Sequence, residues 1–267
     1  MCGTVGKATI LGSLAHAIIK RLSHKQQLSV RIMTDTSKSH FNTIAKTYNE
    51  EVADHVRNHL IQKWWGLVGH YFREHCGVID IGCGEGSNAC FLEDKGMEVV
   101  GVDASEELIK HGSKRYPQLT GKIRVGDALS LDFDDNKFDV ATLIGVLHHI
   151  YSRDDQLKAI REALRVVKPE GTVLIRESNL VNPLFRLFWN YIFPLTAKID
   201  KFGGENWIPM KYLTGFFGGQ VDSVQFFTFI PSFTPQWMLP VATKIEHRLE
   251  SGRFSNLAAH YVLALKK

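Results

Sequence analysis

Three glycines follow an apolar stretch of the chain and leave its backbone bare at that point. The run VIDIGCGEGSNACFLEDKG spans residues 78–96, and Gly82, Gly84 and Gly86 alternate with other residues directly after VIDI. A turn without Cβ atoms lets a ligand approach the backbone closely, and the N-terminus of a following helix offers free N–H groups. The spacing indicates a ligand-binding loop, with a tight strand-to-helix turn that binds nothing as the alternative.

Two carboxylates stand at the ends of the next two apolar stretches. Asp103 ends MEVVGVD, where a carboxylate can accept both ribose hydroxyls of an adenosine or can cap a helix, a role that Ser105 could also fill. Asp127 ends KIRVGD, where it can accept a hydrogen bond from an adenine amino group or cap a turn. Together with the glycine loop, these carboxylates predict a nucleoside-binding site.

The glycine spacing also bears on which nucleotide would bind. A dinucleotide fingerprint reads G-x-G-x-x-G, but Gly86 comes one residue early and Ser87 stands where the third glycine should be. Asp80 precedes Gly82 by two residues, and its negative charge suits a cationic ligand better than a pyrophosphate. The residues therefore disfavour a dinucleotide.

The elements that must position these residues alternate regularly along the chain. Residues 48–72 predict a helix, because their apolar side chains recur at four-residue steps. Short β-branched runs separated by helical stretches follow at 78–81, 97–103, 122–127, 138–144 and 171–177. This alternation predicts a parallel sheet with helices on both faces, in which ligands bind beyond the carboxyl ends of the strands. Further strands are expected at 222–230 and 258–267.

Four motifs in order resemble the signature of one enzyme family. They are DIGCGEG at 80–86, VVGVD at 99–103, VGDALSLDFDDNKFDVATLIGVLHHI at 125–150 and LRVVKPEGTVLI at 164–175. Residues 41–177 as a whole resemble the S-adenosylmethionine-dependent methyltransferases with a Rossmann-like fold. The resemblance implies an α/β fold: a three-layer sheet of seven strands, mostly parallel with the last strand antiparallel, and an inserted helical lid.

The same resemblance implies S-adenosylmethionine as the cofactor and assigns roles to its motifs. Asp80 would help to hold the methionyl ammonium, and Asp103 would bind the ribose hydroxyls. Tyr48, in FNTIAKTYN, would fold over the cofactor. The other residues expected around the cofactor are Gly82, Cys83, Gly84, Gly86, Ala104, Asp127, Ala128, Leu129, Ile144, Gly145 and Val146.

Methyl transfer asks mainly for alignment, and for a base only if the acceptor must lose a proton. His149 in LHHI is the first candidate for that base and His148 the second, since a histidine near its unperturbed pKa of about 6.5 can deprotonate a hydroxyl group. Glu177, after the fifth strand, is a third candidate. A packing or pocket-wall role is the alternative for both histidines.

The substrate must be inferred from residues 178–256, which the motifs do not cover. The segments 178–221 and 231–256 are expected to form lids, and VNPLFRLFWNYIFPL at 181–195 carries only Arg186 as a charge. An aromatic lid over an apolar acceptor is the functional interpretation, and packing of Phe185, Phe188, Trp189 and Phe193 against the sheet is the alternative. A small-molecule or lipid-like acceptor is expected, with peripheral contact to a membrane if part of this face is exposed.

Charge and cysteine usage set the remaining expectations. Residues 1–34 hold five Lys or Arg and no acid, so they form a basic extension, either disordered, targeting or a surface helix, ahead of a methyltransferase domain at 35–267. The rest of the chain is nearly neutral, which argues against a nucleic-acid partner. Four cysteines without a CxxC pattern indicate reduced thiols, no metal site and a cytoplasmic location, peripheral to a membrane at most.

Three functions remain open at this point. The first is methyl transfer to oxygen or carbon of a small or lipid-like molecule. The second is methylation of protein or nucleic acid, although the N-P-P-Y or D-P-P-Y tetrapeptide of amino-methylating enzymes is absent from the sequence. The third is a cofactor-binding partner subunit that has lost catalysis. The residues do not indicate an oligomeric state.

Overall fold

The protein is described from a computed structural model, which covers residues 38–43, 45, 53–179, 181–187, 206–231 and 234–267. Tyr48, the extension 1–34 and the aromatic side chains at 185, 188, 189 and 193 lie outside the described part. None of the described helices combines the length and the apolar character needed to cross a membrane.

Seven strands form one sheet in the order β3-β2-β1-β4-β5-β7-β6. Their bounds are β1 Gly77–Ile81, β2 Glu98–Asp103, β3 Ile123–Val125, β4 Phe138–Ile144, β5 Val167–Ser178, β6 Val221–Phe227 and β7 His260–Lys266. The pairs β1·β2, β2·β3, β1·β4 and β4·β5 are parallel, whereas β7 runs antiparallel to both β5 and β6. The predicted seven-stranded sheet with an antiparallel last strand is confirmed. The strand order reverses between β1 and β4, which is where such sheets bind ligands.

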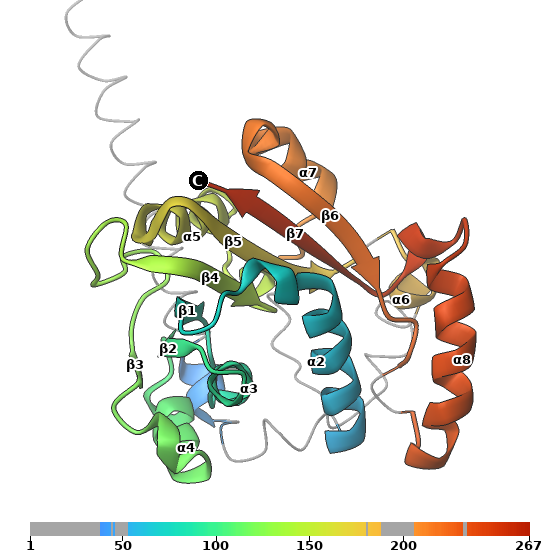
Figure 1. The fold of residues 1–267 in the computed structure, drawn as a ribbon, viewed down its shortest axis with the longest axis horizontal. Helices are drawn as coiled ribbons and strands as arrows, with labels where there is room; N and C mark the ends of the chain where they lie inside the picture. Colours follow the sequence, from blue (N-terminus) through green and yellow to red (C-terminus); the bar gives the residue numbers. More distant parts are fainter. Residues whose placement is uncertain (1–37, 44, 46–52, 180, 188–205, 232–233) are drawn as a thin grey trace, which may run out of the picture.

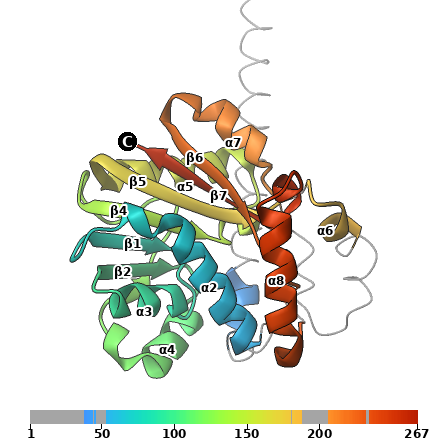
Figure 2. The same ribbon diagram turned by 45° about the vertical axis from the view of Figure 1, so that its right-hand side comes forward.

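Helices cover both faces of this sheet (Figures 1 and 2). Their bounds are α2 Asp54–Val68, α3 Ser87–Asp94, α4 Glu106–Arg115, α5 Arg153–Val166, α6 Pro183–Leu187, α7 Met210–Phe216 and α8 Leu239–Glu250. One apolar cluster joins Leu157 and Ile160 of α5 and Leu213 of α7 to the sheet. A second cluster joins Trp64 of α2 and Leu92 of α3 to the opposite face.

The central strands are apolar on both sides because both of their faces are covered. In β1, Ile79 and Ile81 belong to the first cluster and Val78 to the second, so successive side chains enter opposite layers. The same alternation places Leu263 and Leu265 of β7 in the first cluster and Ala264 in the second. Buried strands of this kind fix the register, since a slip by one residue would exchange the two layers.

Several boundaries differ from those that the sequence predicts. The helix expected at 48–72 is helical at 54–68 and continues as a 3-10 turn, Gly69–Tyr71. The strand expected at 222–230 ends at Phe227, where Thr228 adopts a φ of 61° that cannot continue a strand. β5 is longer than the expected 171–177, because it begins directly after α5.

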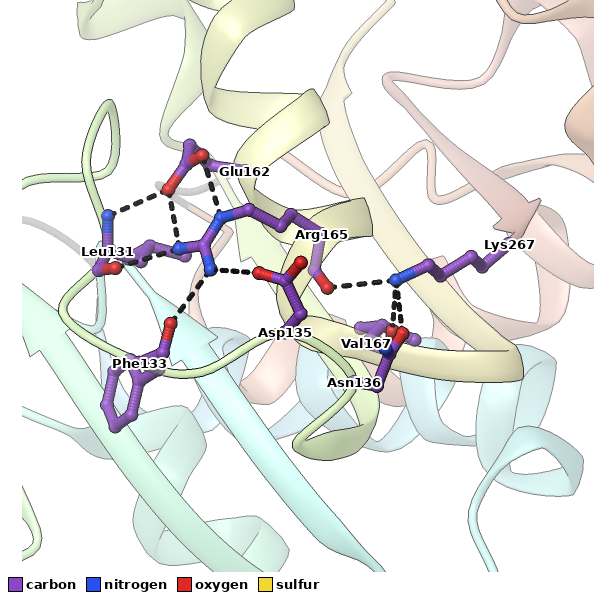
Figure 3. Close-up of polar contacts among 8 residues, drawn as sticks. All are labelled: Leu131, Phe133, Asp135, Asn136, Glu162, Arg165, Val167 and Lys267. Carbon is purple, nitrogen blue, oxygen red and sulfur yellow. Dashed lines mark hydrogen bonds and ion pairs between the residues drawn. The ribbon is translucent and has the colours of Figure 1, made fainter.

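A guanidinium network fixes the segment that connects β3 to β4 (Figure 3). Arg165, at the end of α5, donates to the carbonyls of Leu131 and Phe133, each at 2.8 Å, and to the Glu162 and Asp135 carboxylates. The two carboxylates raise the pKa of Arg165 above its ordinary value, so the charge is permanent. Lys267 joins the network through the carbonyl oxygen of Arg165 at 2.9 Å. The loop that carries Asp127 to Leu129 therefore leads into a fixed segment.

Candidate cofactor-binding site

The glycine loop adopts a conformation that only glycine supports well. Gly82, Gly84 and Gly86 have φ angles of 71°, 55° and 87°, all in the left-handed region. The N–H groups of Gly82 and Cys83 both donate to the Val102 carbonyl, at 2.7 and 3.0 Å, which ties the loop to the end of β2. A Cβ on Gly82 would lie 2.4 Å from a Val146 methyl group. The loop is therefore pressed between β2 and the residues that follow β4.

Asp103 braces this loop from the end of β2. Its Oδ2 accepts the Gly84 N–H at 2.9 Å and its Oδ1 accepts the Ser105 N–H at 2.8 Å. The N-cap of α4 is Ser105, whose hydroxyl accepts the Leu108 N–H, so Asp103 is not the helix cap. Burial raises the pKa of Asp103 from its ordinary value, while the two backbone N–H groups lower it.

Asp80 is a buried carboxylate with one oxygen unpartnered. Its Oδ1 accepts hydrogen bonds from Thr142 Oγ1 at 2.5 Å and Asn88 Nδ2 at 3.1 Å. Its Oδ2 is buried and has no hydrogen-bond partner among the described residues. Burial, which outweighs these two hydrogen bonds, raises the pKa of Asp80 to about 6. A buried carboxylate oxygen without a donor is costly, so the site is suited to a cationic N–H donor from a ligand.

Two adjoining pockets at this edge of the sheet bring most of the predicted residues together. The first is lined by Gly82, Gly84, Asp103, Ala104, Asp127, Ala128, Leu129, Ile144, Gly145, Val146 and His149. The second is lined by Asp80 and Cys83 and shares Gly82, Gly84 and Ile144 with the first. Both pockets thus adjoin at the glycine loop, and we call the two together the crevice.

Gly86 differs from the other glycines of the loop. It is the N-cap of α3, and a Cβ there would lie 2.7 Å from a Leu119 methyl group rather than in either described pocket. Asp127 is exposed, and its Oδ1 accepts the Leu129 N–H at 2.8 Å, which closes the turn at the end of the first pocket. The turn-cap role of Asp127 is therefore present, and its hydrogen bond to an adenine amino group stays a prediction.

Sequence reasoning missed several residues that line the crevice. Phe41 and Tyr151 belong to the first pocket, whereas Arg57 and Arg176 belong to the second. Arg57 lies on the stripe of α2 that also presents Leu60, Ile61 and Trp64 to the crevice. Helical spacing from Trp64 could have identified Arg57, and the position of Arg176 just before Glu177 at the end of β5 could have identified Arg176.

The two histidines after β4 have different surroundings. His148, in the 3-10 turn Leu147–His149, places Nδ1 2.6 Å from Glu177 Oε2, and its ring stacks on Trp207 with centroids 4.2 Å apart. The other oxygen of Glu177 accepts the Leu147 N–H at 2.8 Å. His149 packs edge-on against Phe41, and burial, with its histidine neighbours, lowers the pKa of His149 well below its ordinary value.

Comparison with known proteins agrees with this geometry. A family model described as a methyltransferase domain matches residues 79–175, from β1 to β5. Over these residues the chain is similar to methyltransferase domains, and its sheet order agrees with a Rossmann-like fold. A 2-methyl-6-phytyl-1,4-hydroquinone methyltransferase of Synechocystis is 32% identical over 138 residues, 51% of this chain and 41% of that protein. A demethylmenaquinone methyltransferase of Paenarthrobacter aurescens is 33% identical over 156 residues, 57% of this chain and 59% of that protein.

The chain thus spans about half the length of these two curated relatives. A solved methyltransferase structure from Archaeoglobus fulgidus, 17% identical, superposes with a TM-score of 0.57 and covers 78% of this chain and 94% of its own. At this identity the likeness concerns the fold alone. It agrees with the sheet order and with the placement of the crevice at the reversal between β1 and β4.

The crevice of this methyltransferase domain fits S-adenosylmethionine. The unpartnered Asp80 Oδ2 suits a ligand ammonium group, and the carboxylate of Asp103 at the end of β2 suits ribose hydroxyls. The first pocket offers apolar walls from Val102, Leu108 and Leu129, as an adenine ring requires. In the fold family, the cofactor's contribution to the chemistry is an activated methyl group on a sulfonium sulfur.

Proposed function

We propose that this chain transfers the methyl group of S-adenosylmethionine to an oxygen or carbon atom of a small-molecule or lipid-like acceptor. The observation that carries the proposal is the buried Asp80 oxygen, which has no donor among the described residues and belongs to the same crevice as the Asp103 carboxylate. A structural carboxylate would have both oxygens satisfied by the protein. An oxygen left for a ligand fits a cofactor that carries an ammonium group.

In this proposal the protein contributes mainly alignment. Asp80 holds the ammonium, Asp103 holds the ribose, and the left-handed turn at Gly82 lets the cofactor chain pass close to the backbone. Ile144 and Val146 line the crevice beside that turn and exclude water from the reacting methyl group. Each of these groups binds or orients, and none needs to change its covalent state.

The acceptor's proton is the one step that asks for a base. Of the two histidines His149 lines the first pocket, but we propose the neighbouring His148 as the base because it has a buried carboxylate partner. Glu177 Oε2 lies 2.6 Å from His148 Nδ1, and in this proposal Nδ1 carries the proton while Nε2 accepts one. The carboxylate would also stabilise the imidazolium that forms when Nε2 takes the proton. His149, whose pKa is lowered by burial, is a weaker base and serves as a pocket wall. Glu177 is then a positioning residue.

The acceptor class rests on two observations. One curated relative is named for a 1,4-hydroquinone acceptor and the other for demethylmenaquinone. In this chain, Phe41 and Tyr151 line the same pocket as Gly145 and His149, so an aromatic acceptor would meet ring surfaces there. The lids expected at 178–221 and 231–256 stay a prediction, since no described residue of these segments lines either pocket.

Calorimetric titration with S-adenosylmethionine, S-adenosylhomocysteine and NAD in parallel tests the cofactor half of the proposal. Micromolar binding of the first two and none of the third is expected. Turnover is then followed as release of S-adenosylhomocysteine with lipid and small-molecule extracts, separated by polarity. Binding without turnover on any extract would identify a partner subunit that lacks catalysis, and binding of NAD alone would overturn the assignment of the glycine loop.

A further inference from the structure

Helix α8 exposes apolar side chains and buries an acidic one, the reverse of what a surface helix usually does. The 3-10 turn Gln236–Met238 leads into α8, and along this stretch Trp237, Met238, Val241 and Ile245 are 79%, 42%, 62% and 54% exposed. In contrast, Glu246 on the same helix is only 1% exposed. A surface helix ordinarily buries its apolar stripe and leaves its charges in water. Burial in the core therefore does not account for the apolar residues of α8.

The inner face of α8 is held to α2 by ion pairs. Glu246 Oε2 lies 2.7 Å from Lys63 Nζ and 2.8 Å from His59 Nε2, and Glu250 also pairs with Lys63. The backbone N–H of Phe229 donates to Glu246 Oε1 at 2.9 Å. Figures 1 and 2 show α8 alongside α2 in both views. Helix α8 thus packs against α2 through its acidic side chains.

The outward face is both apolar and cationic. Trp237, Val241 and Ile245 recur at four-residue steps, so they lie on one side of the helix. Lys244 and Arg248, both exposed, lie on the same side by the same spacing. The only acids of residues 234–250 are Glu246 and Glu250, both turned toward α2. We call Trp237, Met238, Val241, Lys244, Ile245 and Arg248 the outer face of α8.

We propose that the outer face of α8 rests in the headgroup region of an anionic lipid bilayer. An amphipathic helix with tryptophan and aliphatic residues beside lysine and arginine lies in the plane of the membrane interface. Its cations are attracted to anionic headgroups, an effect that a neutral bilayer does not supply. The charge complementarity selects an anionic lipid surface over a second copy of this chain, whose outer face would bring like charges together.

The position of α2 connects this surface to the crevice. His59 and Lys63 face α8, whereas Arg57, Leu60 and Trp64 line the second pocket. One helix therefore separates the lipid-facing surface from the cofactor crevice. Membrane binding at the outer face does not require methyl transfer, so vesicle binding and cofactor binding can fail independently.

Flotation of the full chain with vesicles tests the proposal. Vesicles of phosphatidylcholine with about one third phosphatidylglycerol are compared with pure phosphatidylcholine, at low and high salt. The wild type is expected to float with the anionic vesicles, and the double variant Val241→Glu/Ile245→Glu to bind them at least about tenfold more weakly. Lys244→Ala/Arg248→Ala should reduce the difference between anionic and neutral vesicles. Phe216→Glu, at a 47% exposed position of α7, is the matched control and should float like the wild type.

Two results would overturn the proposal. One is a wild type that does not float with anionic vesicles, or a Val241→Glu/Ile245→Glu protein that floats equally well. The other is a lipid-free dimer, seen by sedimentation, that this double variant dissociates, because the outer face would then be a contact between copies. Titration of each variant with S-adenosylhomocysteine establishes that it is folded.

Discussion

Glu177 and His148 form a hydrogen-bonded pair across two neighbouring strand ends, with 2.6 Å between Oε2 and Nδ1. Glu177 lies near the end of β5, and His148 lies in the turn that follows β4. The second carboxylate oxygen holds the backbone of that turn through Leu147, so one buried acid fixes both the ring and its support. The pair fixes the orientation of the His148 ring, whose centroid lies 3.9 Å from that of His149 in the wall of the first pocket.

This pair predicts a graded loss of turnover. We expect His148→Ala to lower kcat by about 100-fold or more, the range for a lost general base. Glu177→Gln should lower kcat by roughly tenfold, because the ring loses the charge that stabilises its protonated form. Both variants should bind S-adenosylmethionine as the wild type does, which calorimetry can establish.

The matched control for that series is His75→Ala, at an exposed position, whereas His149→Ala tests the alternative base. Loss of turnover in His149→Ala with full activity in His148→Ala would reverse the assignment.

Protonation of Asp80 should govern cofactor affinity in mildly acidic solution. Only the ionised carboxylate attracts an ammonium group, and burial raises the pKa of Asp80 to about 6. Affinity for S-adenosylmethionine should therefore be about tenfold weaker at pH 5 than at pH 7, as measured by calorimetry. In the free protein the raised pKa means that ionisation of Asp80 lowers the free energy of unfolding as pH rises from about 4 to 6.

The control for Asp80 is a ligand without the amino-acid group. Methylthioadenosine keeps the adenosine but lacks the ammonium, so its affinity should not share this dependence. Asp80→Asn should bind S-adenosylmethionine weakly at both pH values. A tenfold pH effect on methylthioadenosine as well would assign the titration to another group, such as Asp103.

Replacement of Asp103 should weaken cofactor binding without unfolding the sheet. We expect Asp103→Ala to cost about 1.5–3 kcal/mol of binding free energy, the scale for hydrogen bonds to a charged group. The loss includes the brace on Gly84 N–H as well as the ribose contact. Asp94→Ala, at an exposed position at the end of α3, should bind normally in the same titration. Equal affinities for the two variants would remove Asp103 from the site.

The left-handed turn at Gly82 should tolerate no side chain. Gly82→Ala would place Cβ 2.4 Å from Val146, so the pocket wall must move. We expect a loss of about 2 kcal/mol in the free energy of unfolding, from strain at positive φ, and at least about tenfold weaker cofactor binding. Gly66→Ala is the control, since nothing lies within 4 Å of its Cβ position in α2 and alanine favours a helix.

The ion pair between α2 and α8 predicts a stability change with a definite pH dependence. Lys63→Met leaves Glu246 as a buried acid without its cation, so the free energy of unfolding should fall by about 3 kcal/mol. Although burial opposes it, the hydrogen bond from Lys63 and others lower the pKa of Glu246. Its stabilisation is therefore present above the unfolded pKa of about 4.3 and is lost as pH falls through the lower folded value.

Denaturant unfolding at neutral and acidic pH measures this difference. The gap between wild type and Lys63→Met should shrink in acid, because Glu246 becomes protonated in both. Lys110→Met, which removes an exposed pair with Glu107, should change stability by less than about 0.5 kcal/mol. An equal loss in the free energy of unfolding for Lys63→Met and Lys110→Met would show that burial of Glu246 adds nothing to the effect of its ion pair.

The sheet, and the gathering of the expected cofactor residues at one edge of it, were predictable because local spacing determines them. Gly82 and Asp103 follow β-branched runs, and the carboxyl ends of parallel strands meet at one edge, so their proximity follows from the strand order. Gly82 and Val146 also follow neighbouring strands, although the 2.4 Å that would separate an added Cβ at Gly82 from a Val146 methyl group could not be predicted from the sequence.

Contacts between distant segments could not be predicted in the same way. His148 and Glu177 were each candidate bases, but their pairing depends on how β4 and β5 align, and under our proposal Glu177 positions His148 instead of acting as the base. For α8, the sequence indicates a helix but not which side is outward. The ion pairs of Glu246 and Glu250 with Lys63 of α2 turn the acidic side of α8 toward α2 and leave its apolar side outward.

Helix α2 has a different partner on each of two sides, the crevice through Arg57 and Leu60 and α8 through His59 and Lys63. Because one rigid helix contacts both, a displacement at the crevice can be transmitted to α8. If cofactor binding in the crevice shifts α2, it also shifts α8 and so changes the affinity of the outer face of α8 for its partner. Reciprocity then requires that binding of this partner changes the cofactor affinity by the same factor. Binding at the outer face of α8 and cofactor binding in the crevice would then be coupled through α2.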